Sequence, residues 1–194
     1  MPSPTSVLAE LAGNAAIAQR LLDRFGTLDA TLAAPAADLK ACGVRERGVR
    51  FITLAHEART TAAAEKIRDR CLLSSWSALQ AYLKTTLANE PREQARVLYL
   101  DRKNRLIADE LAGQGTVDHA PIYPREVLRR ALELHASALI LVHNHPSGDP
   151  EPSRQDISLT DQIVARAQPP GIVVHDHLIV GNPEILRMRS RGLV

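Results

Sequence analysis

The sequence predicts an α/β protein in which a mixed β-sheet is flanked by helices and preceded by a small all-α domain. Apolar residues recur at helical spacing up to about residue 89, and the period then changes to the alternation typical of strands. From there on, expected strands and helices follow in the order β-β-α-β-α-β, which indicates helices packed on a mixed sheet. We therefore expect two domains, residues 1–70 and 71–194.

The composition indicates a globular chain. Of its 194 residues, 45% are hydrophobic, which is enough to build a core. Every apolar run is far shorter than the ~20 residues that a membrane span needs, so we expect a soluble, cytoplasmic protein without a membrane partner. Cys42 and Cys71 are too few for a four-thiolate zinc site or a disulfide framework. Any metal must therefore be held by histidines and carboxylates.

The first domain is expected to be a small bundle of short helices. Apolar residues recur at helical spacing over residues 21–39, and the pattern is broken at Gly26, Pro35 and Gly43. The polar, alanine-rich segment 60–69 follows. We interpret it as a connector near the domain boundary.

The second domain begins with an expected helix, because apolar residues from Trp76 to Leu87 share one helical face and Pro91 interrupts the pattern. Alternating residues and turn-forming residues then predict a hairpin, and apolar stripes and runs predict the remaining elements. The expected elements are a helix at 74–89, a strand at 96–100, a turn at 101–104, a return strand at 105–108, a helix at 124–135, a buried strand at 138–142, a helix at 153–167 and a strand at 171–180.

The segment from His143 to Asp156 carries the chemistry. His143 and His145 stand at the end of an expected strand, where alternate side chains point to the same face. A loop rich in proline and glycine then reverses the chain and brings Asp156 into the first turn of the next helix. Two imidazoles and a carboxylate suit Zn²⁺ and leave a fourth position for water, as in catalytic sites. The spacing therefore predicts a zinc site formed by His143, His145 and Asp156.

Each part of this pattern also has a structural interpretation. Ser153 and Asp156 have the spacing of a helix N-cap followed by an acidic first turn, although a serine that caps a helix can still serve a site. A chain with seven histidines contains one His-x-His pair by chance about one time in four. The full spacing, His-x-His-x7-Ser-x-x-Asp, is expected in about one of a thousand such chains. The complete pattern therefore favours metal binding.

Hydrolysis also needs a group that takes a proton from the attacking water and delivers it to the leaving amine. We select Glu93, because it lies just before the first strand, where a side chain can reach the ends of neighbouring strands. Glu110 and Glu126 are the alternatives. Ser153 is a candidate hydrogen-bond donor to the oxyanion that forms on the attacked carbonyl. The expected catalytic residues are therefore Glu93 and Ser153.

The pattern is similar to the JAMM motif of MPN-domain (JAB1/MPN) metalloproteases. The surrounding sequence resembles the RadC family over about residues 91–182, most closely in the stretches 98–101, 123–127, 136–149 and 176–181. This resemblance implies an MPN/JAB1-like, cytidine-deaminase-like domain and a zinc-dependent peptidase or isopeptidase that acts on a peptide or protein. It also implies metal binding by His143, His145 and Asp156, an oxyanion contact by Ser153 and the role of the family's upstream glutamate for Glu93.

A second pair of histidines, His175 and His177, alternates along the last expected strand. Both are expected to point to one face of that strand. We interpret them as structural residues or as hydrogen-bond partners of the metal-binding histidines, since metal sites need such partners.

RadC proteins carry an N-terminal region that resembles a helix-hairpin-helix module, and they were named for DNA repair. Residues 39–44 are similar to its hairpin, and three arginines follow. Gly43, Arg45, Arg47 and Arg50 are the candidate DNA contacts, with backbone N–H groups facing phosphate. Arg45 stands where such hairpins have their second glycine, which compromises a close approach of the backbone to phosphate.

The competing interpretation is that these helices pack together or bind protein, with the arginines on a solvated face. The formal net charge is only +2, and Lys and Arg barely exceed Asp and Glu in the first domain. The second hypothesis is therefore a DNA-associated accessory protein of repair or recombination, whose second domain mainly binds a partner. A zinc nucleobase deaminase lacks support because the Pro-Cys-x-x-Cys pair is missing, and Ser147 has no Gly-x-Ser-x-Gly setting for a serine hydrolase.

Overall fold

The computed structural model describes three stretches of the chain, residues 2–67, 71–115 and 122–194. The chain divides into two compact units, which are described separately: Met1–Ala63 and Ala64–Val194. The domain boundary expected after residue 70 adjoins residues 68–70, which lie outside the described part of the chain.

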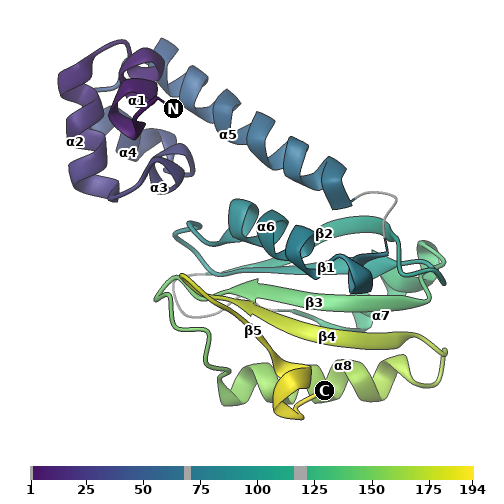
Figure 1. Ribbon diagram of the computed structural model, residues 1–194. Coiled ribbons are helices and arrows are strands. Elements are labelled where there is room, and N and C mark those ends of the chain that lie inside the picture. The colour runs from purple at the N-terminus through teal and green to yellow at the C-terminus, as the bar shows by residue number, and fades with distance from the viewer. Residues whose placement is uncertain (1, 68–70, 116–121) are drawn as a thin grey trace. The chain divides into compact units, whose positions relative to one another are not determined.

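The first unit is a bundle of short helices followed by a longer one (Figure 1). Gly26, Pro35 and Gly43 each lie between two helices, as expected from their breaking effect on the helical pattern. Aliphatic side chains from all five helices form its core, among them Leu21 and Ile52. The helices are α1 Pro4–Ala12, α2 Ala15–Phe25, α3 Leu28–Leu32, α4 Ala36–Ala41 and α5 Glu46–Ile67.

The expected connector at residues 60–69 is helical as far as Ile67, because α5 continues through it. The segment consists largely of alanine and long-chain polar residues, which have high helix propensity. Polarity marked this segment as exposed, and it does not distinguish a solvated helix from a linker.

The second unit contains a five-stranded mixed sheet flanked by helices, as the sequence predicts (Figure 1). The strand order is β2-β1-β3-β4-β5; β3 and β4 are parallel and the other neighbours antiparallel. Helix α6 covers one face, and α7 and α8 cover the other. The elements are η1 Leu72–Ser74, α6 Trp76–Leu87, β1 Gln94–Leu100, β2 Leu106–Gln114, α7 Pro124–Glu133, β3 Ala138–Asn144, α8 Arg154–Ala167, β4 Val173–Val180, β5 Ile185–Arg187 and η2 Met188–Arg191.

Strand β3 lies between β1 and β4, and all seven of its residues are buried. Leu139 and Leu141 pack in one core with Val127 of α7 and Ile163 of α8. A continuous apolar run is what a strand covered on both faces requires. The end of β3 is therefore held firmly, and the metal-site pattern begins there.

Strand β2 is longer than expected, since it continues from the predicted 105–108 segment to Gln114. The strand has two acidic residues at its centre, and each has a basic partner on a neighbouring element. Asp109 pairs with Arg96 of β1 at 2.8 Å, and Glu110 pairs with Arg130 of α7 at 2.6 Å. These cross-element pairs let two carboxylates lie within a strand.

The short strand β5 and the 3-10 helix η2 at the C-terminal end were not predicted. A three-residue strand is too short for a recognisable alternation, and it forms here by antiparallel pairing with the end of β4. Among the described residues, no helix has the length and apolar character needed to cross a membrane.

Candidate metal centre

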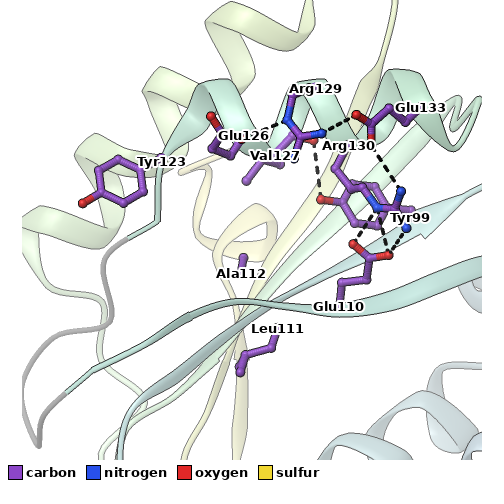
Figure 2. Close-up of a pocket in the computed structure, with 10 residues that line it drawn as sticks. All are labelled: Tyr99, Glu110, Leu111, Ala112, Tyr123, Glu126, Val127, Arg129, Arg130 and Glu133. Atoms are coloured by element: carbon purple, nitrogen blue, oxygen red, sulfur yellow. Dashed lines mark hydrogen bonds and ion pairs between the residues drawn. The ribbon is translucent and has the colours of Figure 1, made fainter.

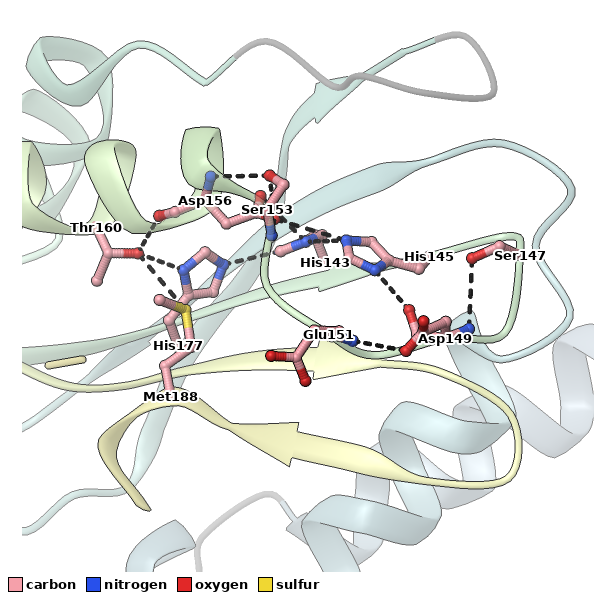
Figure 3. A network of polar contacts seen from close by, with 10 residues as sticks. All are labelled: His143, His145, Ser147, Asp149, Glu151, Ser153, Asp156, Thr160, His177 and Met188. Carbon is pink, nitrogen blue, oxygen red and sulfur yellow. Dashed lines mark hydrogen bonds and ion pairs between the residues drawn. The ribbon is translucent and has the colours of Figure 1, made fainter. Parts of the chain in front are cut away.

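The structure brings His143, His145 and Asp156 together at the end of β3 and the start of α8 (Figure 3). The Nε2 atoms of the two histidines are 2.9 Å apart. The Asp156 carboxylate lies 3.3 Å from His143 Nε2 through Oδ1 and 3.7 Å from His145 Nε2 through Oδ2. The alternation of the strand and the first turn of the helix thus produce the cluster that the sequence spacing predicts.

The other ring nitrogen of each histidine is already engaged. His145 Nδ1 donates to the backbone carbonyl of Asp149 at 2.7 Å, so its Nε2 presents a lone pair when the ring is neutral. His143 Nδ1 lies 2.8 Å from His177 Nε2. Nε2 atoms facing a carboxylate are a donor set suited to a cation. The residues present therefore fit zinc.

The loop after His145 is held in place by two glycines. Gly148 has a φ of 85°, which favours glycine, and its carbonyl accepts a hydrogen bond from Asn182 N–H at 3.0 Å. A Cβ on Gly181 would lie 2.4 Å from the Gly148 carbonyl oxygen, so only glycine allows this approach. The contact fixes the loop whose Asp149 carbonyl orients the His145 ring.

Ser153 and Asp156 form a capping box at the start of α8, which confirms the helix-cap interpretation. Asp156 Oδ2 accepts from Ser153 N–H at 2.8 Å and from Ser153 Oγ at 2.6 Å, while Asp156 N–H donates to Ser153 Oγ at 3.1 Å. The hydroxyl proton of Ser153 is thus donated to Asp156. In this arrangement Ser153 orients the carboxylate, and its proton is not directed at an oxyanion.

The electrostatics of the cluster favour a charged carboxylate. Burial alone would raise the pKa of Asp156, but the contacts with His143 and His145 outweigh it and hold that pKa well below its usual range. The contact with Asp156 raises the pKa of His145 against the effect of burial, with smaller contributions from the Asp149 carbonyl and the charge of Glu93. Complete burial lowers the pKa of His177 well below its ordinary value.

Glu93 lines the same cavity as His143 and Asp156, a space of about 400 Å³. The two alternative carboxylates lie elsewhere. Glu110 and Glu126 line a separate cavity between β2 and α7, where arginines of α7 pair with both (Figure 2). The structure thus places Glu93, the residue selected from the sequence, in the cavity of two candidate metal ligands, and the two alternatives in another cavity.

Comparison with known proteins shows the family of the chain. A model of the RadC-like JAB domain matches residues 73–193. The chain belongs to the RadC family. A UPF0758 protein of Rhodobacter capsulatus is 54% identical over 179 residues, covering 92% of this chain and 84% of the relative. A UPF0758 protein of Ruegeria pomeroyi is 49% identical over 177 residues, covering 91% and 79%.

In this RadC-family chain, Asn144 is a functional candidate that sequence reasoning missed. Its buried side chain accepts from Gln94 N–H at 2.9 Å and lies 3.2 Å and 3.3 Å, through Nδ2, from the carbonyls of Arg92 and Glu90. Asn144 therefore clamps the backbone on both sides of Glu93. The sequence signal for Asn144 was its place between His143 and His145. A residue between two ligands on one strand must point to the other face of that strand.

His175 and His177 do not share one face of β4, contrary to expectation. The register pairs Leu139 with Val174 and Leu141 with His177, so one extra residue is inserted between them. This β-bulge shifts the alternation. His177 then contacts His143, whereas His175 Nε2 lies 2.6 Å from Asn104 Oδ1 in the β1–β2 turn.

In the hairpin between α4 and α5, the backbone N–H groups of Gly43 and Val44 are already bonded within the chain. Gly43 N–H donates to the carbonyl of Lys40 at 2.8 Å, and Val44 N–H to that of Leu39 at 3.2 Å. These N–H groups therefore close the end of α4 and are not presented to a ligand. Arg45, Arg47 and Arg50 are exposed, as both the solvated-face and the DNA-contact interpretation require.

Proposed function

We propose that the chain is a zinc-dependent hydrolase that cleaves an amide bond in a peptide or protein, as a peptidase or isopeptidase. The observation that carries the proposal is the convergence of His143 Nε2, His145 Nε2 and the Asp156 carboxylate, with the opposite nitrogens of both rings engaged. Three protein ligands of this type leave an open position, which is the arrangement of catalytic zinc sites. Membership of the RadC-like JAB domain family supports the same chemistry.

Zinc at this position would supply Lewis acidity, which polarises a carbonyl and lowers the pKa of water towards about 7. The protein must then handle the proton. Glu93 is the group we assign to accept it from the attacking water and to pass it to the leaving amine, because Glu93 lines the cavity of the metal ligands.

Ser153 is assigned a positioning role in this proposal. Its hydroxyl and backbone N–H both hold Oδ2 of Asp156, which fixes the direction of Oδ1 towards His143. The oxyanion contact expected for Ser153 would require its proton to leave Asp156. A Ser153→Ala variant that lowers zinc affinity supports positioning, whereas one that lowers kcat alone supports the oxyanion contact.

The cavity and the proposed chemistry support a substrate class. A space of about 400 Å³ lies in the range of small-molecule and side-chain sites, and its lining includes Ile122, Leu159 and the amides of Gln155 and Gln162. A cavity with apolar and amide groups suits a polypeptide segment. We therefore assign a peptide or protein substrate.

The test combines metal analysis with hydrolysis. We expect the purified chain to retain zinc, and His143→Ala and Asp156→Ala to lose most of it. Glu93→Gln should keep the zinc and lower hydrolysis of peptide or isopeptide libraries by at least about 100-fold. Glu110→Gln, which changes a carboxylate outside the cavity, is the matched control and should leave both properties unchanged. Equal zinc content in the parent chain, His143→Ala and Asp156→Ala would contradict the proposal.

A second candidate function is contact with DNA by the first unit, with the second unit binding a partner. One observation favours it: Arg47 lies over the ring of Phe51 at 5.2 Å, and Phe51 is 41% exposed. Arginine and an exposed aromatic ring are a common combination on nucleic-acid-binding surfaces. Titrations of DNA over a range of salt concentrations test it, and no binding at low salt would exclude it.

A further inference from the structure

A series of polar contacts links His143 at the end of β3 to Asp156 at the start of α8 (Figure 3). His143 Nδ1 lies 2.8 Å from His177 Nε2, and His177 Nδ1 lies 2.6 Å from Thr160 Oγ1. Thr160 Oγ1 lies 2.6 Å from the backbone carbonyl of Asp156. This series of hydrogen bonds therefore begins at the side chain of one metal-ligand candidate and ends at the backbone of another.

The direction of each hydrogen bond follows from the last contact. A carbonyl oxygen can only accept, so the single hydroxyl proton of Thr160 must point to Asp156. The sulfur of Met188, at 3.8 Å, is a weak acceptor and does not compete. Because the Thr160 proton is committed, its oxygen can only accept from His177. His177 therefore carries its proton on Nδ1.

The same logic extends to His143. His177 is completely buried, and its described ring hydrogen-bond partners are His143 and the Thr160 hydroxyl. Burial therefore keeps the imidazole neutral, so its Nε2 has a lone pair. His143 must then donate to it through Nδ1–H. This places the lone pair of His143 on Nε2, the atom that faces His145 and Asp156. The reverse order of protons would put a hydrogen on that atom.

We infer that Thr160 and His177 are positioning residues that set the tautomer of His143 for metal binding. Thr160 lies four residues after Asp156 on α8, so one helical turn supplies both a ligand and the hydroxyl that orients the opposite ligand. This inference rests on the zinc site of the proposed function. Hydrogen-bond partners of metal-binding histidines commonly fix the ring tautomer.

The first test measures the tautomers directly. Long-range ¹H–¹⁵N correlation spectra of the histidine rings are recorded for the metal-free chain and after addition of zinc, with His→Gln variants for assignment. We expect protons on Nδ1 of His177 and His143 in both states. A proton on Nε2 of His177 would overturn the inference. Because the metal-free spectra require no zinc and no hydrolysis, they test it even if the proposed function fails.

The second test measures zinc affinity by competition with a chromophoric chelator. Thr160→Val removes the hydroxyl at nearly constant volume and should weaken zinc binding by about 10-fold or more, whereas Thr160→Ser should stay close to the parent chain. His177→Phe should weaken binding by a similar factor, and His177→Gln should restore part of it because its amide oxygen can accept from His143. His175→Gln is the control away from the site.

Equal zinc affinity in Thr160→Val and the parent chain would also overturn the inference. If Thr160→Val fails to fold, the tautomers of the parent chain decide the question alone. Far-UV circular dichroism of each variant separates a folding defect from a loss of metal binding.

Discussion

At this site a single residue can matter because it holds the backbone beside a functional side chain, and Asn144 is the example. Asn144 touches neither the candidate ligands' Nε2 atoms nor the carboxylate, yet its buried amide fixes the backbone on both sides of Glu93. It follows His143 on the opposite face of β3, because side chains alternate along a strand. One three-residue sequence thus provides two ligand candidates and a clamp for the backbone around Glu93.

Replacing Asn144 by alanine should therefore affect hydrolysis more than zinc binding. We expect hydrolysis to fall by about 10-fold or more, since a small displacement of a catalytic group has effects of this size. The free energy of unfolding should fall by about 1–3 kcal/mol, because backbone groups at residues 92 and 94 lose buried partners. Activity assays and urea unfolding measure the two effects.

A double-mutant cycle provides the control for Asn144. If Asn144 acts through Glu93, Asn144→Ala should have little further effect on hydrolysis in a Glu93→Gln background. An undiminished effect in that background would show that Asn144 acts in another way.

At the level of elements, an ion pair between Arg130 and Glu110 connects α7 to the β1–β2 hairpin, next to the buried Tyr99 (Figure 2). Tyr99 of β1 is 2% exposed, and Arg130 of α7 pairs with Glu110 of β2 beside it. Burial, with a smaller contribution from the charge of Glu110, raises the pKa of Tyr99 to about 12 from 10.0. The folded state therefore favours the neutral phenol.

This shift makes the stability depend on alkaline pH. Between pH 10 and about 12 the unfolded chain has lost the Tyr99 proton while the folded chain keeps it, so stability is fully present below pH 10 and declines above it. We expect a loss of about 2 kcal/mol over this window from Tyr99. Urea unfolding at several pH values measures it.

Tyr99→Phe should flatten this dependence only in part. The pKa of Tyr82 is also raised, first by burial and then by the charge of Asp109, and its contribution has the same sign. An unchanged pH dependence in Tyr99→Phe would show that this phenol is not buried as described.

At the scale of the whole molecule, each of the two compact units has its own apolar core. The first core consists of residues between Leu8 and Ile52. The second lies between the sheet and the helices α7 and α8, and it consists of residues between Val97 and Val174. The second unit contains all three metal-ligand candidates. It also contains Glu93 and the positioning residues Thr160 and His177. Metal binding is therefore expected to be a property of that unit.

A fragment of residues 64–194 should bind zinc like the full chain. Its affinity should lie within about twofold of the parent value, because the hydrogen-bond partners described above for the metal-ligand candidates all belong to residues 64–194. Competition with a chelator compares the two. A fragment that folds by circular dichroism but binds zinc far more weakly would show that the first unit supports the site.

The parts of the site predictable from sequence are those that depend on local geometry. The alternation of a strand placed His143 and His145 together, and the start of a helix fixed Ser153 relative to Asp156. The mixed sheet and its central buried strand followed from local periodicity in the same way. These features need only neighbouring residues, so the order of residues is sufficient.

Tertiary structure decided the features that depend on contacts between distant segments. The β-bulge that separates His175 from His177 arises from the register between β3 and β4. The packing of distant segments also determines that Glu93 lines the cavity of His143 and Asp156, whereas Glu110 lines another one. Thr160 and His177 meet only because α8 packs on β4. Strand pairing and helix packing set these contacts across many residues, and no local spacing encodes them.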